Sequence, residues 1–275
     1  MTDIRPLRLG VVPYLNVLPL LEGLDAVYPR HHWVQATPRQ LAEQLDAGEI
    51  DVAVVSVFEG LRQAGRWGMV PGAAIGSDGP VRSVALFARS PLDQVRRVLL
   101  DRASLTSIHL ARILATNRLA PGVSWELAEA PLAPDFHWQG DALHDAWVAI
   151  GDTALAWEHA FPHRLDLGAA WQEDTGLPFV YAAWWTRPGL QLTAAEQGAF
   201  AEARRRGTAN IDRIVERLNP ADLTPYGGVA GVRSYLSDSI RYTLGERERA
   251  GLERFRFLLD QAGFLGPIPS AAPFR

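Results

Sequence analysis

Small and polar side chains follow five apolar runs of this sequence, so hydroxyl, amide and carboxyl groups collect where the runs end. The runs are Val11–Asn16, with Tyr14 and Asn16 at its end; Val52–Ser56; Gly79–Ser83; Val98–Asp101, which leads to Ser104, Thr106 and Ser107; and Val148–Asp152, with Gly151 before its last residue. In open α/β sheets, ligands bind beyond the carboxyl ends of the strands, where backbone N–H groups and helix N-termini converge. These positions therefore form the candidate site.

Hydroxyl groups at the start of a predicted helix suit an anion. Ser104, Thr106 and Ser107 combine side-chain donors with the free backbone N–H groups of a helix N-terminus. The alternative is that Ser104, Thr106 and Asp152 are only helix N-caps, because these residue types are preferred there for backbone reasons. The Ser56–Glu59 segment has capping-box spacing and is open to the same structural interpretation.

Several reactive groups are absent from the sequence or badly spaced. There is no cysteine and no lysine, and all 27 basic residues are arginine, which excludes thiolate, disulfide and Schiff-base chemistry. Because arginine keeps its proton, a general base must be Asp, Glu, His, Tyr or the substrate itself. His159 and His163 are four residues apart, but Pro162 interrupts the helix that would align them, so no metal site is expected.

Neither nucleic acid nor a membrane is an expected partner. The formal net charge is −4. The basic run Arg204–Arg206 lies in a predicted helix, where it is expected to form a solvent-exposed face. The apolar segment Leu7–Leu21 is interrupted by prolines and lacks a small-residue cleavage site. Later apolar runs are too short to cross a bilayer. These features predict a soluble cytoplasmic protein.

Alternating strands and helices must position the candidate residues. The predicted strands are Leu7–Pro13, His32–Thr37, Val52–Val57, Val95–Asp101, Ser124–Ala130, Ala146–Asp152 and Phe179–Arg187, and the helices between them include Pro19–Leu24, Pro38–Ala47 and Leu105–Asn117. The helix at Pro38 has Thr37 as N-cap, Gln40 completing a capping box and Gly48 beyond its end. This βαβ alternation predicts parallel sheets flanked by helices.

The 275 residues, 48% of them hydrophobic, are enough for two globular lobes. Two extended segments, Ser83–Arg89 and Phe179–Arg187, bracket a central α/β unit and are expected to cross between the lobes. We therefore assign residues 1–88 and 187–275 to lobe 1 and residues 89–186 to lobe 2, with a cleft between them. The last part is predicted to be helical, with an irregular tail at Pro267–Pro273.

An ordered set of short motifs resembles the chorismate dehydratase family. The motifs are Gly10–Asn16 followed by Pro19-Leu20, Ile50–Ala53, Gly79–Val84, Ser104–Ser107, Ile150–Leu155 and Thr175–Val180. Together they extend over about two-thirds of the chain, and their joint order is more specific than any one motif. The resemblance implies the two-lobed fold of type 2 periplasmic binding proteins, no cofactor, and conversion of chorismate to 3-[(1-carboxyvinyl)oxy]benzoate and water in the futalosine route to menaquinone.

Asn16 is the catalytic residue that the resemblance favours. An amide is not a base at neutral pH, so its expected role is to hold the substrate hydroxyl or a carboxylate. The base remains open between the substrate's own enolpyruvyl carboxylate, Asp152 and Glu59. We expect stepwise elimination through a carbanion, with closure of the lobes excluding water.

The two substrate carboxylates must be bound without lysine. The expected substrate-binding residues are Tyr14, Ser56, Ser83, Ser104, Thr106, Ser107, Gly151 and Asp152. Arg82 is the nearest arginine, but strand alternation points it away from Ser83, so at most one of the two is expected to face the cleft.

Two rival functions share this fold. The sibling enzyme 1,4-dihydroxy-6-naphthoate synthase would act on a larger substrate, and the Pro13–Asn16 and Gly79–Ser83 segments favour the dehydratase over it. The other rival is a cytoplasmic small-molecule binding or sensor protein, because a fold alone does not fix an activity.

Overall fold

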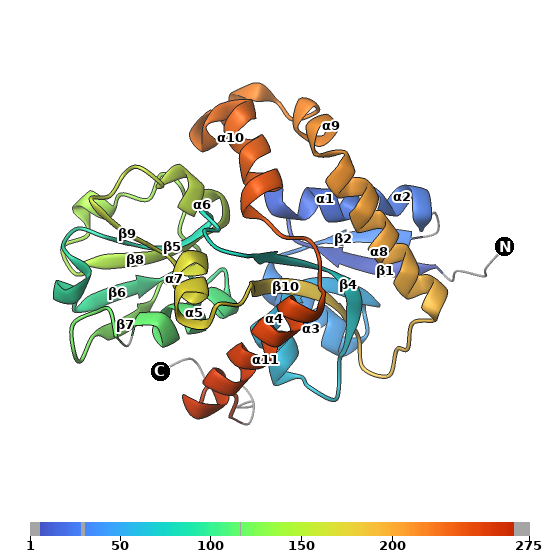
Figure 1. The fold of residues 1–275 in the computed structure, drawn as a ribbon, viewed down its shortest axis with the longest axis horizontal. Helices are drawn as coiled ribbons and strands as arrows, with labels where there is room; N and C mark the ends of the chain where they lie inside the picture. The colour runs from blue at the N-terminus through green and yellow to red at the C-terminus, as the bar shows by residue number, and fades with distance from the viewer. Residues whose placement is uncertain (1–5, 29–30, 116, 267–275) are drawn as a thin grey trace.

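Two five-stranded sheets lie side by side in the computed structural model, which describes residues 6–28, 31–115 and 117–266 (Figure 1). The first sheet has the order β2 (His31–Gln35), β1 (Leu7–Val11), β3 (Val52–Ser56), β10 (Phe179–Thr186), β4 (Gly68–Ser77). The second has the order β7 (Ser124–Leu127), β6 (Arg97–Leu100), β8 (Ala146–Ile150), β5 (Val84–Ala88), β9 (His163–Asp166).

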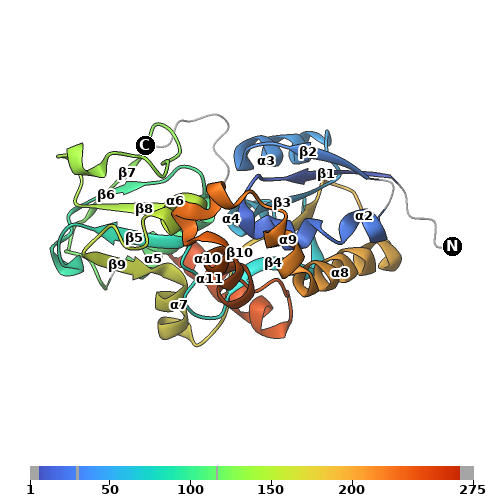
Figure 2. The ribbon, with the colours of Figure 1, turned by 90° about the horizontal axis from the view of Figure 1, so that it is seen from above.

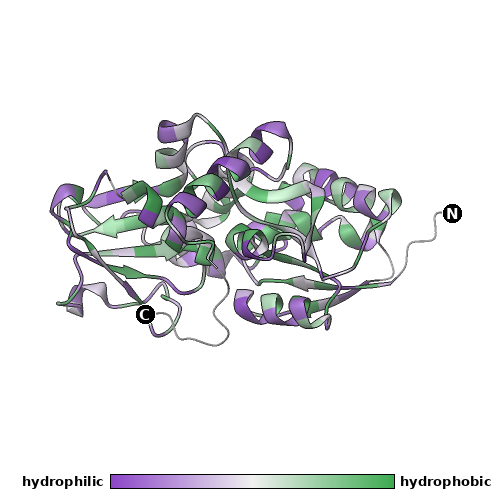
Figure 3. Ribbon diagram, turned by 90° about the horizontal axis from the view of Figure 1, so that it is seen from below, coloured by the Kyte–Doolittle hydropathy of each residue, from purple (hydrophilic) through white to green (hydrophobic). Residues whose placement is uncertain are grey.

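Each sheet is parallel in one half and antiparallel in the other. In the first sheet β1 runs parallel to β2 and β3, whereas β10 is antiparallel to β3 and β4. In the second, β6 runs parallel to β7 and β8, and β5 is antiparallel to β8 and β9. Apolar residues follow the strands of both sheets, and polar residues gather on the outer helices (Figure 3). The predicted two-lobed α/β fold is confirmed, with mixed sheets.

Helices cover both sheets. They are α1 (Leu18–Leu21), α2 (Leu24–Val27), α3 (Pro38–Ala47), α4 (Val57–Arg62), α5 (Leu105–Ala115), α6 (Gly151–Ala156), α7 (Leu167–Thr175), α8 (Ala194–Ala209), α9 (Ile211–Glu216), α10 (Gly228–Ser234) and α11 (Glu246–Gln261). The predicted helix at Pro38 is confirmed as α3: Thr37 accepts from the Gln40 N–H, the capping box is complete, and Gly48 ends the helix in the left-handed region at φ 74°. None of the helices in the described ranges is long and apolar enough to cross a bilayer.

The chain passes between the sheets at residues 78–83 and again through α7 and residues 176–178. Boundaries at 88 and 187 would give β5 to the first lobe and β10 to the second, whereas sheet pairing places each strand in the other lobe. All five residues of β5 are buried because it lies between β8 and β9. Sequence pattern shows that such a run is extended and buried, but not which sheet it joins.

The C-terminal segment joins the two lobes. After α8 and α9, which lie on the first lobe, α10 and a π-helix at Tyr235–Ser239 enter the space between the sheets (Figures 1 and 2). Helix α11 then packs against both β10 of the first sheet and α5 of the second lobe. The segment therefore fixes how the lobes face one another. The predicted tail at 267–273 lies outside the described residues.

Candidate active site

A cavity lies between the lobes, at the carboxyl ends of β1, β3 and β8. Seven of the nine residues predicted from the sequence line it: Tyr14, Asn16, Ser56, Ser83, Ser104, Ser107 and Gly151. They come from both lobes and from the first crossing between them. Separate stretches of the chain thus meet at one place, as the positions after the strands indicated.

The cavity is apolar with a few polar groups, and no charged side chain lines it within the described part of the chain. Its volume is about 80 Å³, several times the roughly 15 Å³ that one water molecule needs. The apolar walls include Val12, Val54, Ile75 and Ile150. An anionic ligand would therefore be held by hydroxyl, amide and backbone N–H donors and not by arginine.

The start of α5 presents two serines to the cavity. Ser104 Oγ accepts from the Ser107 N–H at 3.3 Å and lies 3.0 Å from Ser107 Oγ. Ser104 is thus an N-cap of an 11-residue helix, and it also lines the cavity. Helix α5 begins at Leu105, so the positive end of its dipole and its first N–H groups lie beside these serines. The structural and the binding interpretations of Ser104 are compatible.

Thr106 does not line the cavity but connects the lobes. Its Oγ1 is buried and accepts from the Phe58 N–H of α4 at 3.1 Å. One turn later, the His109 ring stacks on Phe58 with 3.7 Å between ring centroids. Burial lowers the pKa of His109 to about 4, so this ring is neutral at pH 7. We interpret Thr106 and His109 as contacts that hold the lobes closed.

The two candidate carboxylates also lie outside the cavity lining. Asp152, in the first turn of α6, lines a second cavity of about 700 Å³, which Tyr14 also lines. Burial raises the pKa of Asp152 to about 6. Glu59 accepts from Arg62 at 3.2 Å within α4. Neither carboxylate is among the groups that would touch a ligand in the first cavity.

Asn16 reaches the cavity from a 3-10 helix, Leu15–Val17, with one polar atom unused. Its Oδ1 is buried and has no hydrogen-bond partner among the described residues. The Asn16 side chain also interacts with the hydroxyl of Tyr235 and lowers the pKa of that phenol. Since an unpartnered buried acceptor is costly, this oxygen is positioned to accept a hydrogen bond from a ligand.

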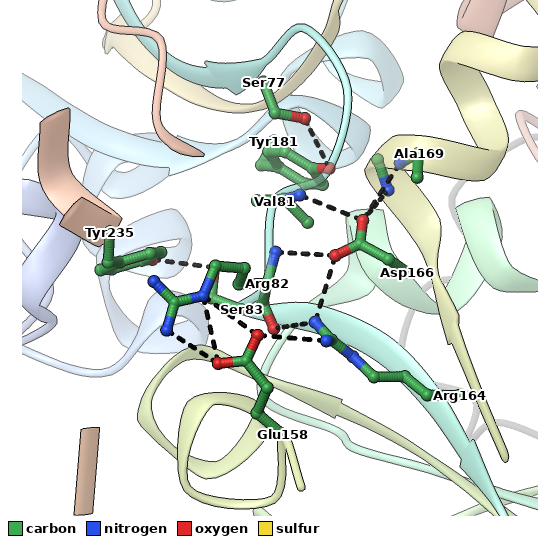
Figure 4. Close-up of polar contacts among 11 residues, drawn as sticks. Ser77, Val81, Arg82, Ser83, Glu158, Arg164, Asp166, Ala169, Tyr181 and Tyr235 are labelled. Carbon is green, nitrogen blue, oxygen red and sulfur yellow. Dashed lines mark hydrogen bonds and ion pairs between the residues drawn. The ribbon is translucent and has the colours of Figure 1, made fainter. Parts of the chain in front are cut away.

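Tyr235 links Asn16 to Ser83. The Tyr235 O–H donates to Ser83 Oγ at 2.8 Å, and Ser83 and Tyr235 are each 1% exposed (Figure 4). Burial raises the pKa of Tyr235 above its ordinary value, against the opposing hydrogen bonds with Ser83 and Asn16, so the phenol stays protonated. Sequence reasoning missed Tyr235, because nothing near it marks a contact 152 residues away.

Asp166 fixes the crossing that carries Ser83. Its carboxylate accepts from the backbone N–H groups of Val81 at 3.0 Å and Arg82 at 2.7 Å, as well as from the first turn of α7 (Figure 4). Arg82 has φ 64°, rare for a residue with a Cβ. Its guanidinium pairs with Glu158 at 2.7 Å, and Arg82 does not line the cavity. Of this pair only Ser83 lines the cavity; both residues precede β5, so the turn at Arg82 and not strand alternation separates their side chains.

Asp101 supports the lobe 2 wall of the cavity. It is 2% exposed at the end of β6 and accepts from the N–H groups of Ala103 at 2.9 Å and Leu132 at 3.3 Å. Burial raises the pKa of Asp101 to about 6, although backbone donors oppose this rise. The folded state therefore holds the proton of Asp101 more tightly than the unfolded state does.

The pH dependence of stability should report this carboxyl group. A raised pKa contributes stability at pH values below about 4, and this contribution is lost as the pH rises through about 6. We expect the free energy of unfolding of the wild type, minus that of Asp101→Asn, to be about 2 kcal/mol larger at pH 4 than at pH 7. Urea denaturation of both proteins at both pH values gives these free energies. The same stability difference between the two proteins at pH 4 and pH 7 would contradict the raised pKa of Asp101.

Comparison with known proteins gives both a sequence family and a fold. A profile described as menaquinone biosynthesis matches residues 7–261. A curated chorismate dehydratase from Thermus thermophilus is 30% identical over 267 residues, which cover 91% of this chain and 94% of that protein. A chorismate dehydratase from Campylobacter jejuni is 24% identical, covering 90% and 94% of the two chains.

Solved structures show the same two-lobed arrangement. A protein from Archaeoglobus fulgidus superposes with a TM-score of 0.69 at 17% identity, covering 96% of this chain and 99% of that one. The periplasmic aliphatic sulphonate binding protein of Escherichia coli has a TM-score of 0.60 at 16% identity, covering 95% and 94% of the two chains. At these identities the structures establish the periplasmic-binding-protein fold alone.

Proposed function

This chain belongs to the menaquinone biosynthesis family, and on that premise we propose that it is a chorismate dehydratase, which removes water from chorismate to give 3-[(1-carboxyvinyl)oxy]benzoate. The observation that carries the proposal is the cavity between the lobes, where Asn16 keeps an unpartnered buried oxygen. Curated relatives along most of the chain are chorismate dehydratases. The sequence family and the site therefore support the same activity.

The polar groups of the cavity match those of chorismate. Asn16 Oδ1 can accept from the ring hydroxyl, which is the group that leaves. The serines at the start of α5 and the hydroxyl of Ser83 can donate to the two carboxylates. Tyr14 and the apolar walls can pack against the ring and exclude water. Each part of the substrate has a complementary group.

Loss of water makes the ring aromatic, so the enzyme must mainly orient the substrate and remove one C–H proton. Substrate and products balance without oxidation or reduction, which fits a carbon–oxygen lyase that needs no cofactor. The dienolate formed when the proton leaves would be stabilised by the same donors that hold the ring carboxylate. We also propose a cytoplasmic location, in keeping with the biosynthetic role of the family.

The substrate's own enolpyruvyl carboxylate is the base that we favour. Neither Asp152 nor Glu59 lines the cavity, and no other carboxylate of the described residues does so. A carboxylate carried by the substrate would be delivered to the C–H by closure of the lobes. Asn16 and Ser83 would then orient the substrate instead of exchanging protons with it.

Two conservative variants test the base. A general base contributes about 100- to 10,000-fold to a rate, so Glu59→Gln and Asp152→Asn are each expected to keep kcat within about threefold of the wild type. Steady-state kinetics with chorismate across pH 5–8 make the measurement. A hundredfold loss in either variant, with an unchanged melting temperature, would make that residue the base.

Direct assay tests the function itself. Purified protein is incubated with chorismate, and the products are separated by chromatography and identified by mass. We expect a product lighter than chorismate by one water, formed at a rate proportional to protein concentration. Binding of chorismate without conversion would favour a sensor of the same fold. If the protein neither binds nor converts chorismate, the assigned substrate is wrong.

A further inference from the structure

Tyr235 enters the space between the lobes from the last third of the chain. It begins a π-helix, Tyr235–Ser239, which ends where the Ile240 N–H donates to the Tyr235 carbonyl at 3.3 Å. π-helical turns are rare and frequently lie at functional sites. The Tyr235 side chain at the start of this turn directs its hydroxyl at Ser83 (Figure 4).

The direction of each hydrogen bond determines what the cavity offers a ligand. The Tyr235 hydroxyl donates its only proton to Ser83 Oγ, and the Asn16 side chain interacts with the same hydroxyl and lowers its pKa. Ser83 therefore keeps its own proton for a ligand, while Asn16 keeps Oδ1 as an acceptor. Each bond in such a chain polarises the next one.

The three residues come from parts of the molecule that could otherwise move independently. Asn16 follows β1 of the first lobe, Ser83 ends the first crossing, and Tyr235 belongs to the C-terminal segment. The Ser83 carbonyl also accepts from the Gly151 N–H at 2.7 Å, which ties it to the start of α6 in the second lobe. One phenol thus holds a donor and an acceptor in a fixed relative position across the cleft.

We propose that Tyr235 is a positioning residue for the dehydration, which sets the acceptor of Asn16 and the donor of Ser83 for the substrate. This inference rests on the proposed function. Tyr235 does not itself line the cavity, so its effect passes through the two side chains that do. Without its hydroxyl, Asn16 and Ser83 lose their common partner and can rotate to other hydrogen-bonding geometries.

The chain offers a matched control seven residues away. Tyr242 is also buried in the C-terminal segment, but its hydroxyl has no hydrogen-bond partner within the described residues. Tyr235→Phe and Tyr242→Phe each remove one buried hydroxyl and keep the ring. A general effect of losing a hydroxyl from this segment would appear in both variants, whereas positioning of Asn16 and Ser83 would be lost in Tyr235→Phe alone.

Steady-state kinetics with chorismate test the proposal. We expect Tyr235→Phe to lower kcat about tenfold, the factor equivalent to one hydrogen bond, with KM changed less than threefold. Tyr242→Phe should match the wild type. The double variant Tyr235→Phe/Ser83→Ala should lose less than the product of the two single losses, because the part of the Tyr235 effect that passes through the Ser83 hydroxyl is already missing.

Three results would overturn the proposal: an unchanged kcat in Tyr235→Phe, an equal loss in Tyr242→Phe, or multiplying losses in the double variant. Turnover by the wild type separates these outcomes from failure of the proposed function, because an inactive wild type refutes the function itself. Melting temperatures of all variants identify any that lose activity by unfolding. If Tyr235→Phe unfolds, Ser83→Ala removes the same hydrogen bond from its other end.

Discussion

Asn16→Ala is expected to lower kcat for chorismate about 100- to 1,000-fold, the loss seen when an enzyme loses one preorganised polar contact to its transition state. The substitution removes the unpartnered Oδ1, which can accept from the ligand, and the contact of the side chain with Tyr235. The apolar walls and the serines of α5 remain. Chorismate should therefore still bind, but with its hydroxyl no longer held.

Stability should respond to Asn16→Ala in the opposite way. An unpartnered buried oxygen costs free energy in the empty protein, so its removal should leave the free energy of unfolding within about 1 kcal/mol of the wild type or raise it. Urea denaturation and chorismate kinetics on the same preparation measure both properties. Full activity, or inactivity that accompanies an unfolded chain, would contradict the role given to Asn16.

Asp166→Ala should destabilise the protein by about 3 kcal/mol, because a partly buried carboxylate that accepts from several backbone N–H groups and pairs with an arginine is removed. The Asp166 side chain is 12% exposed and also pairs with Arg164 at 3.2 Å. Its removal leaves the N–H groups of Val81 and Arg82 without their acceptor and deprives α7 of its N-cap. The left-handed turn at Arg82 then loses the contacts that hold it.

Two other variants separate the contributions of Asp166. Thr193→Ala removes the side-chain N-cap of α8, on the first lobe, and should cost about 1 kcal/mol. Asp166→Asn keeps Oδ1, which accepts from Val81 and the first turn of α7, and should fall between the wild type and Asp166→Ala. A loss in Asp166→Ala no larger than that in Thr193→Ala would show that the carboxylate is only a helix cap.

Local signals in the sequence were sufficient for the features that depend on neighbouring residues. The helix at Pro38 was predictable because Thr37, Gln40 and Gly48 act within a few residues of one another. The same holds for Ser56 and Ser104, whose capping bonds span three residues. Both serines also line the cavity, because a helix that starts at a strand end necessarily begins beside the site.

Features that depend on distant partners were not predictable in this way. β5 and β10 read as extended segments, but their sheets are decided by strands far away in the chain. Thr106 has the residue type of a site hydroxyl, yet its partner is Phe58 of the other lobe. Asp166 and Tyr235 act on residues more than 80 positions away, with no spacing rule to reveal them.

The first sheet contains a strand, β10, that is synthesised long after its neighbours β3 and β4, and this order affects how the protein assembles. The second sheet is built from one continuous stretch, β5 to β9, whereas the first must wait for β10 to enter between β3 and β4. At about 5–20 residues per second, the second lobe can fold while the first is still incomplete. The cavity is finished later still, when Ile240 closes its wall. Vectorial synthesis therefore makes the cavity a late product of chain growth, completed after the strands of both sheets.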